Sequence, residues 1–240
     1  MARSENNKNK ENRLIATGNL LFTILPELTF KSSFSIDRRN AVNTTFLDPY
    51  KTSWGRTQFG EGSDKRNMNT VLTFDNVATY NKSFGLHGLE VMAGTSFTDS
   101  DYTNSSITGS HYRDGSIQTL NAANKINWSD GALSEGSQWG IMSYFGRVAY
   151  NYDSKYLLTV NMRRDGSSRL SPEGRWDDFP SVSAAWRMSS EEFMNGLDWL
   201  DDLKIRGGWG STGNQSGLGD YAYLQLYNIN RINWTVAGQE

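Results

Sequence analysis

Strict alternation of apolar and polar residues over 144–163 constrains the fold of this chain more than any other feature. Successive side chains of a β-strand point to opposite faces, so a period of two predicts a strand whose faces meet different surroundings. Val148 lies on one expected face and its neighbour Arg147 on the other. A tight turn at 153–155 divides the stretch into a hairpin. The question is then whether the apolar face meets a protein core or lipid.

The same period recurs and predicts eight strands, at 14–24, 28–37, 70–80, 86–97, 143–152, 156–165, 179–187 and 203–211. The connections alternate in length, with about three residues at 25–27, about 32 at 38–69, about five at 81–85, about 45 at 98–142 and about three at 153–155. Outer-membrane barrels typically have short periplasmic turns and long extracellular loops. The pattern therefore favours an all-β fold: an antiparallel transmembrane β-barrel segment of about eight strands, part of a larger barrel.

Electrostatics indicate which face would meet lipid. A lysine or arginine near the bilayer midplane costs up to roughly 2–4 kcal/mol, and several together approach the whole stability of a typical domain, roughly 5–15 kcal/mol. We therefore expect the basic face to line a wet lumen, through Arg147, Arg163, Arg187, Lys204 and Arg206. We expect the opposite face to meet lipid, through Val148, Tyr150, Leu158, Val160, Met162, Val182, Ala184, Trp186, Ile205 and Trp209.

Tyr150, Tyr152 and Tyr156 flank the short turn at 153–155. Tyrosine and tryptophan gather where a membrane meets water, because one end of the ring is apolar and the other polar. We expect these three rings to belong to an aromatic girdle.

Composition excludes several other classes of protein. Of the 240 residues, 37% are hydrophobic and 21% are charged, as in ordinary folded proteins, so a disordered chain is not expected. The formal net charge of −2 offers no concentrated basic surface for nucleic acid. Without cysteine there is neither a disulfide framework nor a thiolate metal site. No apolar run reaches the roughly 18 residues of a membrane-spanning helix.

Motifs that could carry catalysis or hold a cofactor lack the context that their chemistry needs. The hexapeptide at 208–213 matches G-x-G-x-x-G, but the preceding strand alternates and no helix is expected after it. Its glycines are interpreted as relief of a crowded strand end. The two histidines have no zinc spacing, and the acidic clusters at 99–101 and 177–178 have no calcium-loop spacing. We expect no catalytic, cofactor-binding or metal-binding residue and no enzymatic activity.

Aromatic residues in the two long predicted loops are candidates for contact with a substrate. An exposed ring can stack on a sugar face or anchor a partner, while packing of the loop on itself is the alternative. The candidates are Trp54, Tyr112, Trp128 and Trp139.

The connection over 188–202 departs from the pattern of short turns. Ser189 followed by Glu192 matches a capping box, and Gly196 matches a helix stop. The sequence predicts a single short helix there, on the periplasmic side.

A dense series of short motifs lies between 144 and 224. In order they are KYLLT at 155–159, RRDGSSR at 163–169, RW at 175–176, FPSVSAAWR at 179–187, LKIR at 203–206, GSTGNQ at 210–215 and GDY at 219–221. In this order they resemble the SusC/RagA family of TonB-linked outer-membrane transporters. The resemblance is looser over the strands between 14 and 97, and 38–69 and 98–142 carry none of it.

The resemblance implies a barrel of about 22 strands with an internal plug. It implies import of nutrients such as oligosaccharides or peptides, driven by energy that the TonB complex transmits through the plug. It further implies a SusD-like surface lipoprotein as partner, contact with the lipid bilayer, no cofactor and no nucleic acid. The expected location is the outer membrane of a Gram-negative, Bacteroidetes-like cell.

The chain departs from that family pattern because no plug, TonB box or signal peptide is recognised in it. We therefore expect 1–240 to be a partial TonB-dependent receptor barrel domain, with the strongest match over 144–224. Two other functions stay open at this point: a soluble carbohydrate-binding β-protein and a β-rich glycoside hydrolase.

Overall fold

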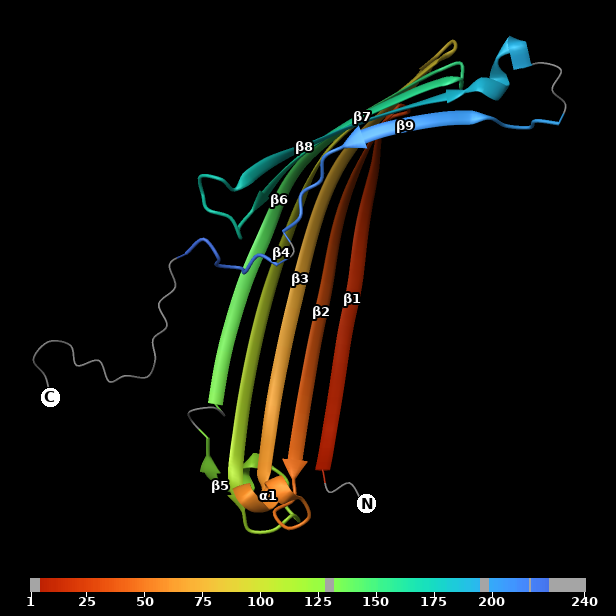
Figure 1. Ribbon diagram of the computed structural model, residues 1–240. Coiled ribbons are helices and arrows are strands. Elements are labelled where there is room, and N and C mark those ends of the chain that lie inside the picture. The colour runs from red at the N-terminus through yellow and green to blue at the C-terminus, as the bar shows by residue number, and fades with distance from the viewer. Residues whose placement is uncertain (1–4, 128–131, 195–198, 216, 225–240) are drawn as a thin grey trace, which may run out of the picture.

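The computed structural model describes residues 5–127, 132–194, 199–215 and 217–224. They form one antiparallel sheet of nine strands, in the order β1-β2-β3-β4-β6-β7-β8-β9, with the short β5 paired to β4 (Figure 1). The expectation of an all-β segment of about eight antiparallel strands is confirmed. The strands are β1 Glu5–Leu25, β2 Leu28–Leu47, β3 Glu61–Phe84, β4 His87–Tyr112, β5 Ala123–Ile126, β6 Ala132–Tyr152, β7 Tyr156–Ser167, β8 Trp176–Arg187 and β9 Lys204–Gly210.

Three tight turns, β1 to β2, β3 to β4 and β6 to β7, lie at one end of the sheet, at the upper right of Figure 1. Asp153 (φ 52°) and Ser154 (φ 55°) both adopt the left-handed backbone conformation that closes the third turn, as the sequence pattern at 153–155 predicts. The turn expected at 81–85 is shorter, since β3 continues to Phe84. We call this the turn end. The opposite end of the strands, with α1 (Ser53–Gln58) and β5, is the loop end.

The N-terminal strands run far beyond their expected ends, so the prediction of long loops at 38–69 and 98–142 is wrong. Strand pairing continues to Leu47 opposite Glu61, and the connections shrink to 48–60 and 113–131. The sequence pattern fails here because polar residues occupy both faces of these extensions, for example Asn40 and Arg39 side by side on β2. With water on both faces, no period of two remains to be recognised.

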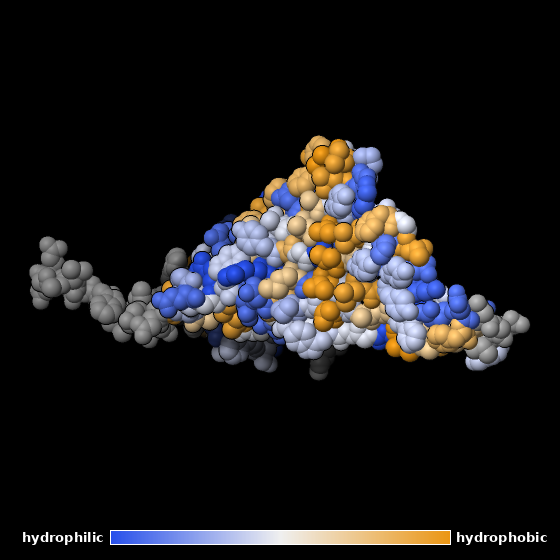
Figure 2. Space-filling model, turned by 90° about the horizontal axis from the view of Figure 1, so that it is seen from above, coloured by the Kyte–Doolittle hydropathy of each residue, from blue (hydrophilic) through white to orange (hydrophobic). Residues whose placement is uncertain are grey.

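Between these extensions and the turn end, one face of the sheet is predominantly apolar, with Ser32, Asn76 and Thr95 as a polar row within it. Val148 lies opposite Val91 and Val160, and Val160 lies opposite Val182 in turn. Figure 2 shows hydrophobic residues gathered in a band through the middle of the face in view, with hydrophilic residues on either side. Nothing covers this band within the described part of the chain: Val148 and Val160 stay 44% and 46% exposed.

The band fits the hydrocarbon core of a membrane. On β3 it runs from Leu72 to Tyr80, nine residues or about 26 Å along the strand, which gives about 20 Å of height at a tilt of about 40°. The boundary of the band on the side of the loop end crosses the rows of paired residues diagonally, as tilted strands require. For example, Leu14 belongs to the band on β1, but its partner Arg38 lies beyond Ile36, where the band on β2 stops. Toward the loop end, the band stops at Leu14, Ile36, Leu72, Phe97, Met142, Met162 and Val182. Single apolar residues such as Val42 and Met68 lie farther along this face among polar ones.

The loop end carries the small hydrophobic core of the described residues. Phe46 and Tyr112 are 3% and 4% exposed, and their rings meet edge to face at 5.0 Å. Asp48 accepts a hydrogen bond from the Tyr50 amide at 2.9 Å, which lowers the pKa of its carboxyl group. Thr52 caps α1 by accepting a hydrogen bond from the Gly55 amide. This end is therefore an ordered cap.

The single short helix expected at 188–202 is wrong. Two 3₁₀ turns stand there, η2 (Met188–Ser190) and η3 (Glu192–Met194), and the expected stop at Gly196 falls outside the described residues. Ser189 does not cap η2, since its hydroxyl donates to Asp202 at 2.8 Å instead. Across the ranges that the structure describes, no helix has the length and apolar character needed to cross a membrane.

Candidate functional site: the polar face of the sheet

The five basic residues expected to line a lumen all share one face of the sheet. The register pairs Arg187 with Lys204, and Ala185 with Arg206. Arg147 lies opposite Asn161, which stands two positions before Arg163 on the same strand. We call this side the polar face and the reverse side the apolar face.

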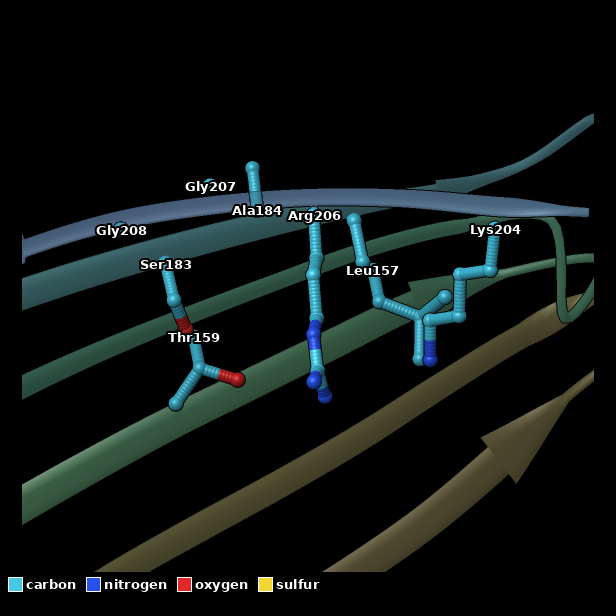
Figure 3. Close-up of a pocket in the computed structure, with 9 residues that line it drawn as sticks. Leu157, Thr159, Ser183, Ala184, Lys204, Arg206, Gly207 and Gly208 are labelled. Atoms are coloured by element: carbon cyan, nitrogen blue, oxygen red, sulfur yellow. The ribbon is translucent and has the colours of Figure 1, made fainter.

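An open hollow of about 480 Å³ lies on the polar face near the turn end. Leu157, Thr159 and Ser183 contribute to its lining, and Lys204 and Arg206 reach over it. Figure 3 shows these five side chains pointing to one side of the sheet, whereas Ala184 points to the other. The hollow is therefore a feature of the polar face, with two cationic groups above uncharged side chains.

The cations around this hollow differ in how far they are neutralised. Arg147 approaches Glu90 at 3.8 Å, and Arg187 approaches Asp202 at 3.5 Å. Lys204 and Arg206 form no ion pair with any residue in the described ranges. The turn end of the polar face thus keeps a local excess of positive charge, which favours contact with anionic or strongly polar groups.

Arg163, by contrast, is bound to neighbouring residues of the sheet. It pairs with Asp165 at 2.7 Å, donates to the Ser143 hydroxyl at 2.9 Å and lies over the Phe145 ring at 5.9 Å. Most of its hydrogen-bonding capacity is used by these neighbours. Its role in the described structure is to join β6 to β7.

After β9 the chain turns across the polar face instead of continuing along the sheet. We call residues 211–215 and 217–224 the strap. The Ser211 amide donates to the Pro180 carbonyl at 3.0 Å, and Gln215 accepts from the Ser167 hydroxyl at 2.8 Å. The strap therefore passes from β8 over the end of β7, and Figure 1 shows it running alongside the middle of the long strands.

The far end of the strap is held by a partly buried ion pair. Arg169 donates to Asp220 at 2.8 Å, and each side chain is only 17% exposed. The guanidinium of Arg169 also lies over the ring of Trp139 at 4.6 Å. The Gln138 amide donates to the Tyr221 hydroxyl at 3.0 Å. Three parts of the chain meet at this point: β6, the connection from β7 to β8, and the strap segment 217–224.

A second hollow, of about 310 Å³, lies between the strap and the sheet. Ile141, Phe179 and Leu218 supply apolar lining, while Asp165 and Arg175 supply charges. The strap thus adds a mixed apolar and charged recess to the polar face. A recess of this kind can hold a small polar ligand with an apolar part.

On the apolar face, aromatic rings mark the turn end of the band. Tyr156 stacks between Tyr152 and Trp186, with ring centroids 6.3 Å and 6.5 Å away. Glu191 accepts hydrogen bonds from the Tyr156 hydroxyl at 2.6 Å and the Trp186 indole at 2.9 Å. The hydrogen bond from Tyr156, followed by that from Trp186, holds the pKa of Glu191 below its usual range. The row has the composition and position of an interfacial girdle.

The candidate aromatic residues take four different places. Trp54 lies on α1 in a connection and is 58% exposed. The loop assignment of Tyr112 and Trp139 is wrong, since Tyr112 ends β4 and is buried, and Trp139 lies in the middle of β6. Trp128 lies outside the described residues. Sequence reasoning missed Asp220, because its partner Arg169 is 51 residues away and no local pattern links them.

The glycines of the hexapeptide at 208–213 serve packing. A Cβ atom on Gly210 would come within 2.8 Å of the Ser181 side chain, and one on Gly213 within 2.4 Å of the Phe179 ring. Both close approaches require the absence of a side chain. Among the described residues no three His, Asp or Glu side chains cluster as metal ligands.

No family model matches the chain, whereas known proteins do. It is 32% identical over 209 residues to the TonB-dependent receptor SusC of Bacteroides thetaiotaomicron, a match that covers 87% of this chain and 20% of SusC. It is also 32% identical over 208 residues to the TonB-dependent receptor P39 of Formosa agariphila, covering 85% of this chain and 20% of P39. The chain thus spans about a fifth of the length of these relatives, and both are named as receptors and neither as an enzyme.

Solved structures agree with this relationship at the level of the fold. The RagAB peptide transporter superposes with a TM-score of 0.86 at 21% identity, over 99% of this chain and 26% of the RagAB chain. The RagAB peptide importer in its open-open state gives the same TM-score, identity and coverage. The nine-stranded sheet therefore has the fold of part of a larger barrel.

Proposed function

We propose that this chain, a barrel segment of a SusC/RagA-family TonB-dependent receptor, forms part of the wall of an active importer in the outer membrane. The supporting observation is the sheet with one predominantly apolar face and one polar face, which is what a wall between hydrocarbon and a watery passage requires. Residues 1–240 would be a partial barrel domain, with its turn end toward the periplasm and its loop end outside the cell.

We further propose that the imported substrate is an oligosaccharide or a peptide. RagAB is a peptide transporter, and the chain shares its fold. The proposed partners are a SusD-like surface lipoprotein at the loop end and the TonB complex, reached through a plug domain. A location in a Gram-negative, Bacteroidetes-like outer membrane follows from the same reasoning.

The polar face would then line the lumen. In this proposal Arg147, Arg187, Lys204 and Arg206 form a basic zone near the periplasm, with Arg163 higher on the wall. Trp139, on the polar face beside the strap, is the candidate ring for contact with substrate inside the passage. Trp54, exposed at the loop end, is the candidate for contact with substrate or the lipoprotein, and Tyr112 supports the cap beneath it.

Neither a soluble carbohydrate-binding protein nor a glycoside hydrolase gains support. A soluble protein would have to cover the apolar band, and in the described residues Leu158 and Trp209 are 45% and 65% exposed. A hydrolase would need catalytic carboxylates in a cleft, and no observation points to such a pair.

The proposal is tested with single tryptophan variants of the full-length protein in cells. Trp54→Ala and Trp139→Ala should each lower the rate of uptake of labelled peptides or oligosaccharides by about tenfold, since an anchoring ring contributes about 1–2 kcal/mol. Trp199→Ala is the matched control, because Trp199 is 78% exposed but lies in the connection at the turn end. Unchanged uptake and unchanged lipoprotein affinity in both test variants, at equal amounts in the membrane, would contradict the proposal.

A further inference from the structure

We infer that the apolar side of the sheet carries a binding site for lipid phosphate groups, placed just above the band on β1 and β2. Lys8, Lys10 and Arg38 make up this outer basic patch. The inference rests on the proposed function, because it takes the loop end to face the outer leaflet. It adds a ligand to a surface that has no part in transport.

The patch begins at the level of the lipid headgroups. Arg38 is the next outward position after Ile36, about 7 Å farther along the strand and about 5 Å higher at a tilt of about 40°. The headgroup region is about 5–7 Å thick on each side of a bilayer. Lys10 stands four residues beyond Leu14, about 10 Å higher, and a lysine can lay its stem along the wall to lower its amino group. Lys8 lies two residues beyond Lys10 on the same face of β1.

The cations of the patch have no carboxylate partner among the described residues, although all three are exposed. Arg38 makes one side-chain contact, from its guanidinium to the Met68 sulfur at 3.2 Å. Arg66, the other outward cation nearby, is already paired with Asp64 at 3.0 Å. The unpaired cations of this surface on β1 and β2 are therefore Lys8, Lys10 and Arg38. Asp99 and Asp101 lie on the same side of the sheet, two strands away from Arg38 on β4.

The reverse side of the same strands provides a contrast. Arg13 pairs with Asp37 at 2.5 Å, and Arg39 pairs with Glu11 at 2.7 Å. These four residues lie on the polar face at the height of the patch. On β1 and β2 at this height, the arginines of the polar face are matched by carboxylates, whereas Lys8, Lys10 and Arg38 are not. On β3, Lys65 of the polar face also has no ion pair within the described ranges. Unpaired cations beside an apolar band favour a ligand that is both anionic and apolar.

A lipid suits the patch better than a protein partner. The patch adjoins the apolar band: Arg38 directly follows Ile36 on this face of β2, and on β1 only Asn12 separates Leu14 from Lys10. A molecule bound here would touch hydrocarbon-facing residues and cations together, which matches acyl chains joined to a phosphorylated headgroup. Arginine and lysine are the side chains that bind phosphate most strongly.

The test uses the full-length protein in a neutral detergent and diphosphorylated lipid A as the probe, with retained lipid counted by native mass spectrometry. The K8Q/K10Q/R38Q variant should bind this lipid at least about tenfold more weakly than the wild type, since each cation near a charged surface contributes about fivefold. The double variant E11Q/R39Q is the matched control: it removes charge at the same height on the polar face and should bind as the wild type does. Dephosphorylated lipid A should bind all three proteins alike.

Four outcomes would overturn the inference. The triple variant could bind diphosphorylated lipid A as well as E11Q/R39Q does. It could lose dephosphorylated lipid A to the same extent as the diphosphorylated form. The wild type could release its lipid to millimolar inorganic phosphate, which would indicate a site for a free anion. If the patch instead retained a protein from the envelope in place of lipid, the lipid assignment would also fail. Uptake is measured separately, so failure of the transport proposal leaves this result readable.

Discussion

Trp139 of the sheet is linked to the strap through a neighbour that makes two contacts. It lies in β6, on the polar face, and the guanidinium of Arg169 covers its ring at 4.6 Å. Arg169 in turn holds Asp220 of the strap. A change in any of the three side chains should therefore be felt at the other two.

The ion pair between Arg169 and Asp220 should control how firmly the strap is held. Asp220→Asn removes the charge but keeps the shape, and leaves a partly buried guanidinium without its carboxylate. We expect a loss of about 1–2 kcal/mol of local stability and about tenfold faster hydrogen exchange of the backbone amides in 217–224 of the full-length protein.

Asp202→Asn is the control for that variant, because its pair with Arg187 is longer, at 3.5 Å, and Asp202 is 59% exposed. Exchange in the strap should not change in this control. Equal exchange rates in D220N and the wild type would show that the backbone contacts alone hold the strap.

At the scale of the element, the strands have two parts that obey different rules. Between Leu72 and Tyr80, β3 largely alternates, as the proposed wall between lipid and water requires. Between Glu61 and Val71 it alternates no longer, yet it stays paired with β2 and β4 for about 33 Å along the strand. Pairing with long neighbours, not a pattern of its own, keeps this part extended.

Two neighbouring positions on β6 should differ in how well they tolerate a new positive charge. Val148→Arg places a guanidinium near the middle of the apolar band, at a cost of about 2–4 kcal/mol, so the full-length barrel should assemble poorly. Ala149→Arg is the matched control, since Ala149 lies on the polar face directly opposite Glu90.

The measurement is the amount of folded barrel in the outer membrane, judged by resistance to unfolding by detergent at room temperature. Val148→Arg should lower that amount strongly, while Ala149→Arg should match the wild type. The reverse order of the two variants would mean that the faces have been assigned the wrong way round.

At the scale of the whole molecule, the described sheet has two open edges, β1 and β9. An open edge exposes unpaired backbone groups, which hydrocarbon cannot satisfy. The chain spans only 20% of the length of SusC.

The 240-residue segment expressed alone should therefore be insoluble in water and should need detergent to show a β-sheet circular dichroism spectrum. Sedimentation with and without dodecyl maltoside measures this. A compact, water-soluble monomer with Val160 and Trp186 protected from solvent would contradict both the membrane assignment and the proposed function.

The amino-acid sequence by itself determined the strands in the membrane, their two faces and the turn at 153–155. These features repeat every two residues or depend on one local turn, and hydrocarbon on one side imposes the repeat. The same local rule is sufficient to assign Arg147 and Lys204 to one face.

Only the tertiary structure decided where the long strands end. It places Tyr112 and Trp139 in strands, whereas the sequence pattern predicted loops for both. Water on both sides of the extensions removes the period from the sequence, so pairing there depends on the neighbouring strands. The strap likewise depends on contacts such as Arg169 with Asp220, 51 residues apart, which arise from the path of the chain in space and leave no local pattern.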